Sequence, residues 1–430
     1  MKKSILMLLA TTSCLLAACG GGEEGGEGGG GSVTGNLKIR FHVDSKSKEG
    51  IAYKKLIDAF NAENSKNGLT VNPLFVARTA GDSAYERQLA TDKLEGTLPD
   101  IITFDAPNCA AYAEAGYLYD FTNELSDEDK AQYVTLNQYQ GKVYGIPIQE
   151  SSAGFYYNKK ILDQAGVNVS GITVDNPWTF SQFKDACEKI KNIGKIPVDM
   201  RYSATKDETA TYLLYPFIYA AGGRFLNDEG TTATGYFDSV KSINGFQFLK
   251  DILTSGYTSY GINDGFPKGN VGFFLSSGWT IDEIKNEWTD TFKNESEWGL
   301  LPYPKGEKAS SANGSWCFAI GNNGRTDKAA VVKLLKYLTS KDSSKAITDA
   351  TGMIPANKEV EIHVEPGSPE SVLYDQLQKT SETRPATVCY PQFSSAFSQV
   401  ISGLGEGDLA TLVRNKAAVL QKHLDEANKK

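Results

Sequence analysis

The sequence predicts an α/β protein with two domains, and three observations carry this prediction. Apolar residues alternate over 37–43, a helical apolar pattern follows, and a second apolar run spans 69–76. Another helical pattern then leads to a third apolar run at 98–105. Strands alternating with helices indicate parallel pairing, with the helices packed on the sheet. The chain has 430 residues, which is too many for one ordinary core, so we expect two domains.

Local patterns place the later elements. Residues 141–158 indicate a turn followed by extended chain. Thr179 is a candidate helix cap, because Gln182 follows three residues later as in a capping box. The apolar run 209–221 stops at a pair of glycines, which favours a helix end. We also expect a strand over 272–279 and helices over 246–253, 329–338 (capped by Thr326) and 409–424.

The first 19 residues have the features of an export signal. Lys2 and Lys3 precede an apolar run over 5–18, which is too short to span a bilayer stably. The run ends in Leu-Ala-Ala-Cys, which resembles the lipobox of bacterial lipoproteins, in which the cysteine is acylated and becomes the new N-terminus. We therefore predict lipidation at Cys19. The alternative is a plain secretory signal in which Cys19 is incidental.

Residues 20–36 are predicted to form a flexible tether. They are mostly glycine, with a few glutamates and no large apolar side chain before the first strand. Such a segment buries too little apolar surface to offset the entropy lost on ordering. A tether placed directly after a lipidated cysteine suits a folded body held at a membrane surface.

Composition excludes several classes of function. The formal net charge of −8 disfavours a nucleic-acid partner, because phosphate contacts need clustered basic residues. The three histidines are far apart in sequence and none has metal-ligand spacing, so we expect no metal and no cofactor. The long cysteine spacings favour free buried thiols, although disulfide pairing stays open for an exported protein. The cysteines concerned are Cys109, Cys187, Cys317 and Cys389.

A series of short motifs occurs in a characteristic order along the body of the chain. In chain order the motifs read LPDIITFD (98–105), GKVYGIP (141–147), FYYNK (155–159), AGGR (221–224), GW (278–279) and GMIP (352–355). As a set they resemble the sugar-type (family 1) extracellular solute-binding proteins, of which maltose-binding proteins are the best known. The resemblance covers about residues 37–424.

This resemblance implies a two-lobed fold of the periplasmic-binding-protein type II, with a mainly parallel sheet in each lobe. It places the N-terminal lobe at 37–149 plus 315–352 and the C-terminal lobe at 150–314 plus 353–430. The chain is then expected to cross between lobes near 149–151, 312–316 and 352–356. It also implies a monomeric, non-catalytic lipoprotein that captures a carbohydrate, expected to be an oligosaccharide, in the cleft. The lobes would close on it by hinge motion, and an ABC permease would receive it.

Sugar sites combine hydrogen-bonding side chains with aromatic rings that stack on sugar faces. The resemblance puts Trp279 at a stacking position, and the glycine before it favours the cleft over the core. Glu150 falls at the first crossing, where the alternative is a solvent-facing carboxylate. Asp105 and Asn108 follow the third strand, where such residues also cap helices.

Four further aromatic positions are candidates, each with a core role as the alternative. Tyr215 and Tyr212 lie in a run that places an aromatic in the cleft of family members. Trp316 falls at the second crossing, beside a glycine that permits close backbone approach. Phe393 matches a late aromatic segment, but Ser394 stands where maltose-type members carry an aromatic, which puts a maltodextrin ligand in doubt. Arg78, Asp44 and Ser45 follow early strands and are more simply explained as surface residues.

Three other functions remain open at this stage. A secreted glycosidase would use paired carboxylates, for which Asp105 and Glu150 are candidates. A binding protein for a non-sugar solute would share the fold, and a polyamine ligand would favour an acid-rich cleft. A sensor subunit would present its ligand to a membrane kinase in place of a permease.

Overall fold

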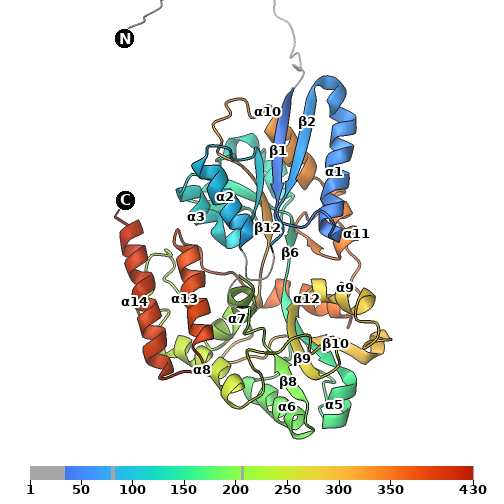
Figure 1. The fold of residues 1–430 in the computed structure, drawn as a ribbon, viewed down its shortest axis with the longest axis vertical. Helices are drawn as coiled ribbons and strands as arrows, with labels where there is room; N and C mark the ends of the chain where they lie inside the picture. Colours follow the sequence, from blue (N-terminus) through green and yellow to red (C-terminus); the bar gives the residue numbers. More distant parts are fainter. Residues whose placement is uncertain (1–33, 79–82, 205–207, 430) are drawn as a thin grey trace, which may run out of the picture.

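The structure, a computed structural model, describes residues 34–78, 83–204 and 208–429. They form two lobes stacked along the long axis of the molecule (Figure 1). We call the lobe that contains the start of the described chain the N-lobe and the other the C-lobe. The predicted signal, 1–19, and residues 20–33 of the predicted tether lie outside the described residues.

The N-lobe is built on one six-stranded sheet. Its strands are β1 (Gly35–Phe41), β2 (Leu69–Phe75), β3 (Ile101–Asp105), β4 (Asn137–Tyr139), β5 (Lys142–Pro147) and β12 (Trp316–Ile320). The strand order is β2-β1-β3-β12-β5-β4. β1 pairs in parallel with β2 and β3, as the sequence predicts, whereas β12 runs antiparallel to both β3 and β5.

Helices from two distant parts of the chain cover the N-lobe sheet. They are α1 (Lys48–Asn64), α2 (Ala84–Leu94), α3 (Cys109–Glu114), α4 (Asp127–Ala131), α10 (Ala329–Thr339) and α11 (Lys341–Thr351), with 3-10 turns η1 (Ser65–Asn67), η2 (Ala106–Asn108) and η3 (Thr122–Glu124). Alternating residues of β1 and one face of α1 join the same buried cluster. The cap expected at Thr326 is wrong: Lys328 occupies the N-cap of α10 and no side chain caps it.

The C-lobe has a smaller sheet and more helices. Its strands are β7 (Ala153–Asn158), β8 (Ile196–Asp199), β9 (Val271–Ser277) and β10 (Trp298–Leu301), in the order β10-β7-β9-β8. Its helices are α5 (Lys159–Ala165), α6 (Phe180–Asn192), α7 (Glu208–Ala220), α8 (Val240–Thr254), α9 (Trp279–Asn286), α12 (Pro369–Lys379), α13 (Tyr390–Ser402) and α14 (Leu409–Ala427), with the turn η4 (Glu295–Glu297). Only β8 and β9 pair in parallel among these strands; β7 pairs antiparallel with both of its neighbours, so this sheet is mixed, not mainly parallel as expected.

Local sequence chemistry explains two of the C-lobe elements. The capping box at the start of α6 is confirmed, because Thr179 and Gln182 each bond the backbone N–H of the other. Past the end of α7, Gly222 has φ of +77°, and a Cβ added at Gly223 would lie 2.7 Å from the backbone of Ser242. The glycine pair therefore lets α8 pack closely against the end of α7.

Short strands lie at or near the passages between the lobes: β6 (Gln149–Glu150), β11 (Ser311–Ala312) and β13 (Ile354–Pro355). β14 (Ser381–Glu382) pairs in parallel with β11 and stays within the C-lobe, between α12 and α13. β6 pairs with β13, and Ser151 forms a bridge with Gly314, so two crossings run beside each other. The chain crosses from the N-lobe to the C-lobe for the third time after residue 358, later than the expected 352–356. Lys358 still bonds the N-lobe backbone at Gln132, and the Asn357 amide bonds Thr339 O, so these contacts hold the chain on the N-lobe.

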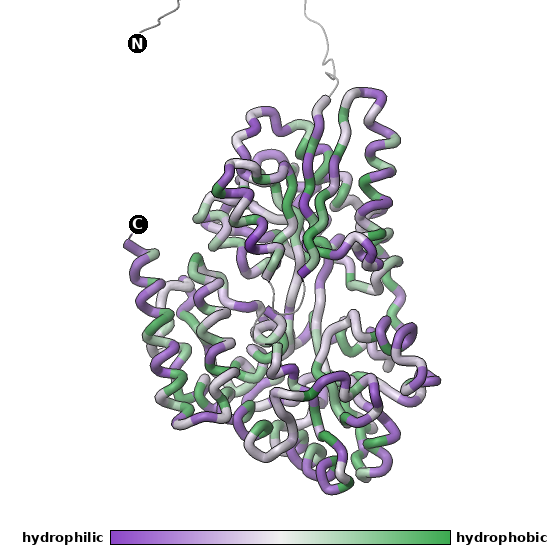
Figure 2. The backbone as a smooth tube through the Cα atoms, viewed as in Figure 1, coloured by the Kyte–Doolittle hydropathy of each residue, from purple (hydrophilic) through white to green (hydrophobic). Residues whose placement is uncertain are grey.

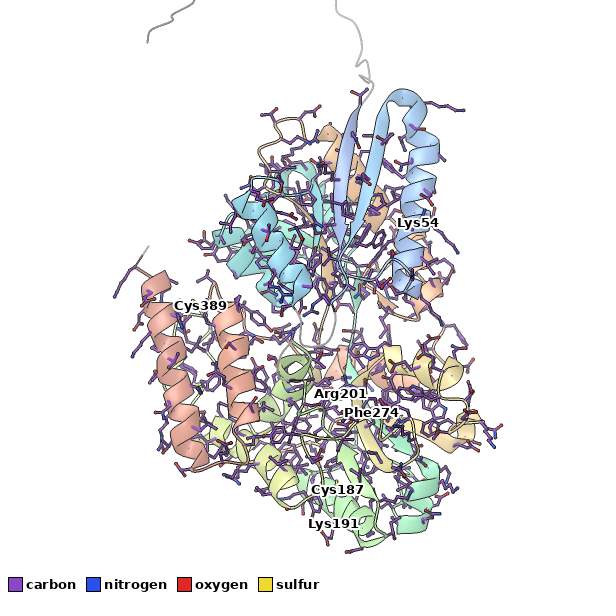
Figure 3. The ribbon with its side chains drawn as sticks, viewed as in Figure 1. Lys54, Cys187, Lys191, Arg201, Phe274 and Cys389 are labelled. Carbon is purple, nitrogen blue, oxygen red and sulfur yellow. The ribbon has the colours of Figure 1, made fainter. Side chains whose placement is uncertain are left out.

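Each lobe has its own apolar interior. Apolar residues concentrate on the strands and inner helix faces, and the outer faces are hydrophilic (Figure 2). The four cysteines of the body are free and buried, as the sequence favours, and Cys187 and Cys389 lie well apart (Figure 3). No helix within the described ranges has the length and apolarity needed to cross a membrane.

Candidate functional site

A cavity of about 520 Å³ lies between the lobes, within the usual size range of small-molecule sites. We call it the central cavity. The N-lobe lines it where β1, β2 and β3 end and where β12 begins, and the C-lobe lines it with the start of α7 and the β9–α9 junction. The crossings contribute residues 149–152, 314–315 and 360–364. The N-lobe contribution agrees with the rule that ligands bind at the carboxyl ends of parallel strands.

Trp279 presents the most open aromatic surface among the predicted site residues. It is the first residue of α9, lines the central cavity and remains 42% exposed. Gly278 precedes it, and the Tyr212 ring lies 6.5 Å away between centroids. The indole is thus held at the cavity wall with area free to cover the apolar face of a ligand.

Tyr212 lines the cavity from α7 and is fixed by hydroxyl contacts. Its Oη lies 3.0 Å from Ser151 Oγ at the first crossing and 3.3 Å from Ser277 Oγ at the end of β9. Ser277 donates in turn to the backbone carbonyl of Ser152. The ring therefore ties the wall of the C-lobe to the hinge.

Trp316 also lines the cavity, but protein groups already occupy its ring. The His42 imidazole stacks on it with centroids 3.5 Å apart, and the Arg78 guanidinium lies 5.0 Å from the indole centroid. Burial, followed by the nearby Arg78 charge, lowers the pKa of His42 well below its usual value, so the imidazole is neutral at pH 7. This stack supports the cavity wall more than it offers a free face.

Asp105 lines the cavity at the end of β3, where it is held by a buried ion pair. Arg384, which follows β14 in the C-lobe, donates Nη1 to Asp105 Oδ2 (2.9 Å) and Nη2 to Oδ1 (2.7 Å). Nη1 also donates to Glu208 Oε1 at 2.7 Å. Burial opposes the Arg384 charge, but the adjacent carboxylates outweigh it and hold the Arg384 pKa above its usual value. A bidentate pair of this kind joins the two lobes directly.

Glu150 brings unmet hydrogen-bonding capacity to the cavity wall. It is 6% exposed, and burial raises its pKa to about 7, against a weaker opposing hydrogen bond from Asn313. Its Oε1, the neighbouring Gln149 Oε1 and the Arg384 Nε are buried without a partner among the described residues. Buried polar atoms normally have partners, so three residues that line the cavity have hydrogen-bonding capacity that the described residues leave unmet.

Three predicted site residues do not line the central cavity. Tyr215 is fully buried: its hydroxyl accepts from Asn313 N (2.7 Å) and donates to Glu382 O, which ties the second crossing to β14. Phe393 packs inside the C-lobe core, with the Phe225 ring 5.0 Å away between centroids. Asn108 lines a second cavity, described below. Of the weaker candidates, Arg78 lines the cavity, whereas Asp44 and Ser45 are exposed at the start of α1.

Sequence reasoning missed several residues that shape the site. No motif marks Arg384 or Glu208 in the sequence. Their importance arises because Arg384 pairs both with Asp105 of the N-lobe and with Glu208 of its own lobe. Glu49 on α1 lines the cavity with its carboxylate accepting from Tyr53, and burial raises its pKa to about 7. The segment 360–364 also lines it, and neither composition nor periodicity marks that segment in the sequence.

Residues 55–369 match the family described as bacterial extracellular solute-binding protein. The chain belongs to this family. Among curated relatives of this solute-binding protein is the maltooligosaccharide ABC transporter solute-binding lipoprotein of Streptococcus pneumoniae. The two are 23% identical over 310 residues, which cover 69% of each chain.

Solved structures share the fold over nearly the whole chain of this solute-binding protein. A solute-binding protein of Thermotoga lettingae, bound with α-D-tagatose, has a TM-score of 0.75 at 21% identity and covers 90% of this chain and 99% of its own. The cyclic α-maltosyl-1,6-maltose binding protein of Arthrobacter globiformis also has a TM-score of 0.75, at 22% identity. The match covers 92% of this chain and 100% of its own. The fold is that of the type II binding proteins, as the sequence predicts.

Proposed function

We propose that this protein captures a carbohydrate in the central cavity and delivers it to an ABC permease. The observation that carries the proposal is the composition of the cavity wall. An open indole, Trp279, lines the same cavity as Gln149, Glu150 and Arg384, polar residues that each keep one hydrogen-bonding atom without a partner among the described residues. Sugars need this combination, because they carry hydroxyls around their edges and apolar C–H groups on their faces.

The named ligands of related proteins support a carbohydrate cargo. The pneumococcal relative is a maltooligosaccharide-binding lipoprotein, and the two similar structures bind tagatose and a cyclic maltosyl-maltose. These ligands differ in length and linkage. They favour the chemical class of the cargo without choosing among its members.

The arrangement of the crossings supports delivery by hinge closure. β6 and β13 pair beside the Ser151–Gly314 bridge, so the lobes can rotate about a narrow band of backbone. Closure places ligand contacts from both lobes around one cargo molecule. A permease that recognises the closed pair of lobes would then distinguish loaded from empty protein.

We further propose that acylated Cys19 anchors the protein at the outer face of the cell membrane, with no other membrane contact and as a monomer. β1 begins at the end of the N-lobe farthest from the C-lobe (Figure 1). A tether attached there would leave the cavity and both lobes clear of the anchor. Replacing Cys19 with Ser should release the protein from the membrane fraction.

We propose binding without turnover. Glycoside hydrolysis requires one carboxyl group as acid and another as base or nucleophile. Of the two candidate carboxylates, Asp105 accepts two charge-assisted bonds from Arg384 and is 7% exposed. Because both oxygens of Asp105 are occupied by Arg384, this carboxylate is not free to contact a glycosidic bond, which favours capture over catalysis.

The test is thermal stability of the protein lacking residues 1–19, against a panel of mono- and oligosaccharides. A ligand that binds only the folded state stabilises it by about 2.7 kcal/mol at a hundredfold excess over Kd. We expect a shift with one sugar class and no consumption of that sugar. Trp279→Ala should remove most of the shift, whereas Tyr374→Ala, at a similarly exposed aromatic outside the cavity, should retain it. No shift across the panel would refute the carbohydrate cargo, and consumption would refute binding without turnover.

A further inference from the structure

A second cavity, of about 500 Å³, lies beside the central one. We call it the side cavity. Hydroxyl-bearing residues from α13 and tyrosines near α3 line much of it, together with Asn108. Arg78, Asp105 and Glu208 line both cavities, so these residues stand at the boundary between them.

The boundary is a continuous row of polar contacts that spans the lobes. Arg384 faces the central cavity and holds Asp105 of the N-lobe and Glu208 of the C-lobe. On the far side, Ser394 Oγ donates to Glu208 Oε2 at 2.6 Å, and Tyr390 also donates to Glu208. Both Ser394 and Tyr390 line the side cavity. We call this row of five residues the partition.

The partition resists displacement by a neutral ligand. The Arg384 and Asp105 side chains are only 3% and 8% exposed, and their two parallel bonds are charge-assisted. A sugar chain that passed from one cavity to the other would separate these charges. Its hydroxyls cannot replace the guanidinium charge, so the buried Asp105 carboxylate would lose its cation, while Arg384 would keep only Glu208.

Arg384 also offers a place for a ligand to end. Its Nη1 and Nη2 point to the carboxylates, whereas its Nε is buried without an acceptor among the described residues. The residue itself lines the central cavity. A ligand that fills the central cavity would therefore end against the Arg384 side chain without disturbing the ion pair.

We propose that the Asp105–Arg384 pair limits the length of the cargo, so that this protein takes a short saccharide enclosed by the central cavity. Arg384 is then a specificity-determining residue. The inference rests on the proposed carbohydrate function and narrows it, because the sequence suggests an oligosaccharide without limiting its length. The competing arrangement is a long saccharide that displaces the pair and fills both cavities.

The experiment is a length series, measured by calorimetry on the protein lacking residues 1–19. The probes are maltodextrins, cellodextrins and xylo-oligosaccharides, each from the monosaccharide to the hexasaccharide. In whichever series binds, we expect the association constant to peak at a short member and to fall at least tenfold by the hexasaccharide. A constant that stays level or rises to the hexasaccharide would overturn the length limit.

The second arm opens the partition with Asp105→Ala combined with Arg384→Ala, which removes both charges together. Because both residues line the cavity, the readout is the ratio of hexasaccharide to short-sugar affinity, which should rise at least tenfold. The matched control is Asp100→Ala with Arg325→Ala, a pair bonded at 2.6 Å within the N-lobe and away from both cavities; its ratio should not change. An unchanged ratio in a folded double variant would overturn the role of the pair.

The two proposals fail differently. If no saccharide of any length binds, the carbohydrate function itself is wrong and the length limit falls with it. If saccharides bind with no dependence on length, only the length limit is wrong. Should the double variant fail to fold, the wild-type length profile alone decides between the short-cargo and long-cargo arrangements.

Discussion

Among the described residues, the ion pairs Asp105–Arg384 and Lys48–Asp282 both connect the lobes, and they differ in burial and in geometry. Asp105–Arg384 is buried, bidentate and extended by Glu208, Tyr390 and Ser394. Lys48–Asp282, which joins α1 to α9, has side chains that are 56% and 35% exposed. The first pair is largely shielded from water and salt, because its side chains are only 3% and 8% exposed, whereas the second pair is screened by both. We therefore expect the buried pair to hold the lobes together more strongly than the exposed pair does.

Breaking the buried pair should have the largest effect. In Arg384→Ala, the carboxylates of Asp105 and Glu208 lose their cation and regain water only if the lobes part. We expect the closed form to be destabilised by about 3–5 kcal/mol. X-ray scattering of the ligand-free protein should show a larger radius of gyration than wild type. An unchanged radius, together with unchanged urea stability, would mean that the pair is not formed in solution.

Glu150 offers a further comparison, because it is buried in the same cavity wall and forms no ion pair with any described residue. Its folded-state pKa of about 7 exceeds the unfolded value of 4.5, so the folded protein binds the extra proton between these values. The contribution of this protonated carboxyl group to the free energy of unfolding is then fully present below pH 4.5, and it is lost as pH rises through 7. At pH 8 the loss reaches up to about 3 kcal/mol.

The test is Glu150→Gln, which removes this ionisation. Urea unfolding should give similar stabilities for variant and wild type near pH 4.5, and a more stable variant at pH 8. Glu361→Gln is the matched control, since Glu361 lines the same cavity but is exposed. If the advantage of the Glu150→Gln variant does not grow with pH, Glu150 is already charged in the folded protein.

The smallest effect is expected at the exposed pair. Lys48→Ala should change the free energy of unfolding by less than about 1 kcal/mol at low salt. In about 1 M salt, where the Debye length is near 3 Å, the difference from wild type should vanish. Denaturation at both ionic strengths measures it. If Lys48→Ala lowered the free energy of unfolding as much as Arg384→Ala does, the exposed pair would be as important as the buried one.

The sequence predicts those features of this molecule that depend on neighbouring residues. The parallel pairing of β1 with β2 and β3 follows from the alternation of strands and helices along the chain. The helix cap at Thr179 follows from Gln182, which stands three residues later. The family and the two-lobed fold follow from motifs that span most of the chain. Of the eight predicted site residues, five line the central cavity: Trp279, Glu150, Asp105, Trp316 and Tyr212.

What the sequence does not predict depends on contacts between distant segments. Tyr215 and Tyr212 share one helix and one residue type, yet only the neighbours of each decide which reaches the cavity. Phe393 and Ser394 are adjacent, but the helix turns the first into the core and the second toward Glu208. Arg384 is 279 residues from Asp105, and no local pattern connects them.

The position of β12 bears on how the chain reaches its native state. This strand comes from residues 316–320, yet it lies between β3 and β5, which are made from the first third of the chain. During synthesis or export, those two strands keep unpaired edges until the whole C-lobe sheet has emerged. Closing a sheet across such a separation is slow, and open strand edges invite aggregation. Completion of the N-lobe is therefore a late event, and a chain released before residue 320 lacks a finished sheet in the lobe that it began first.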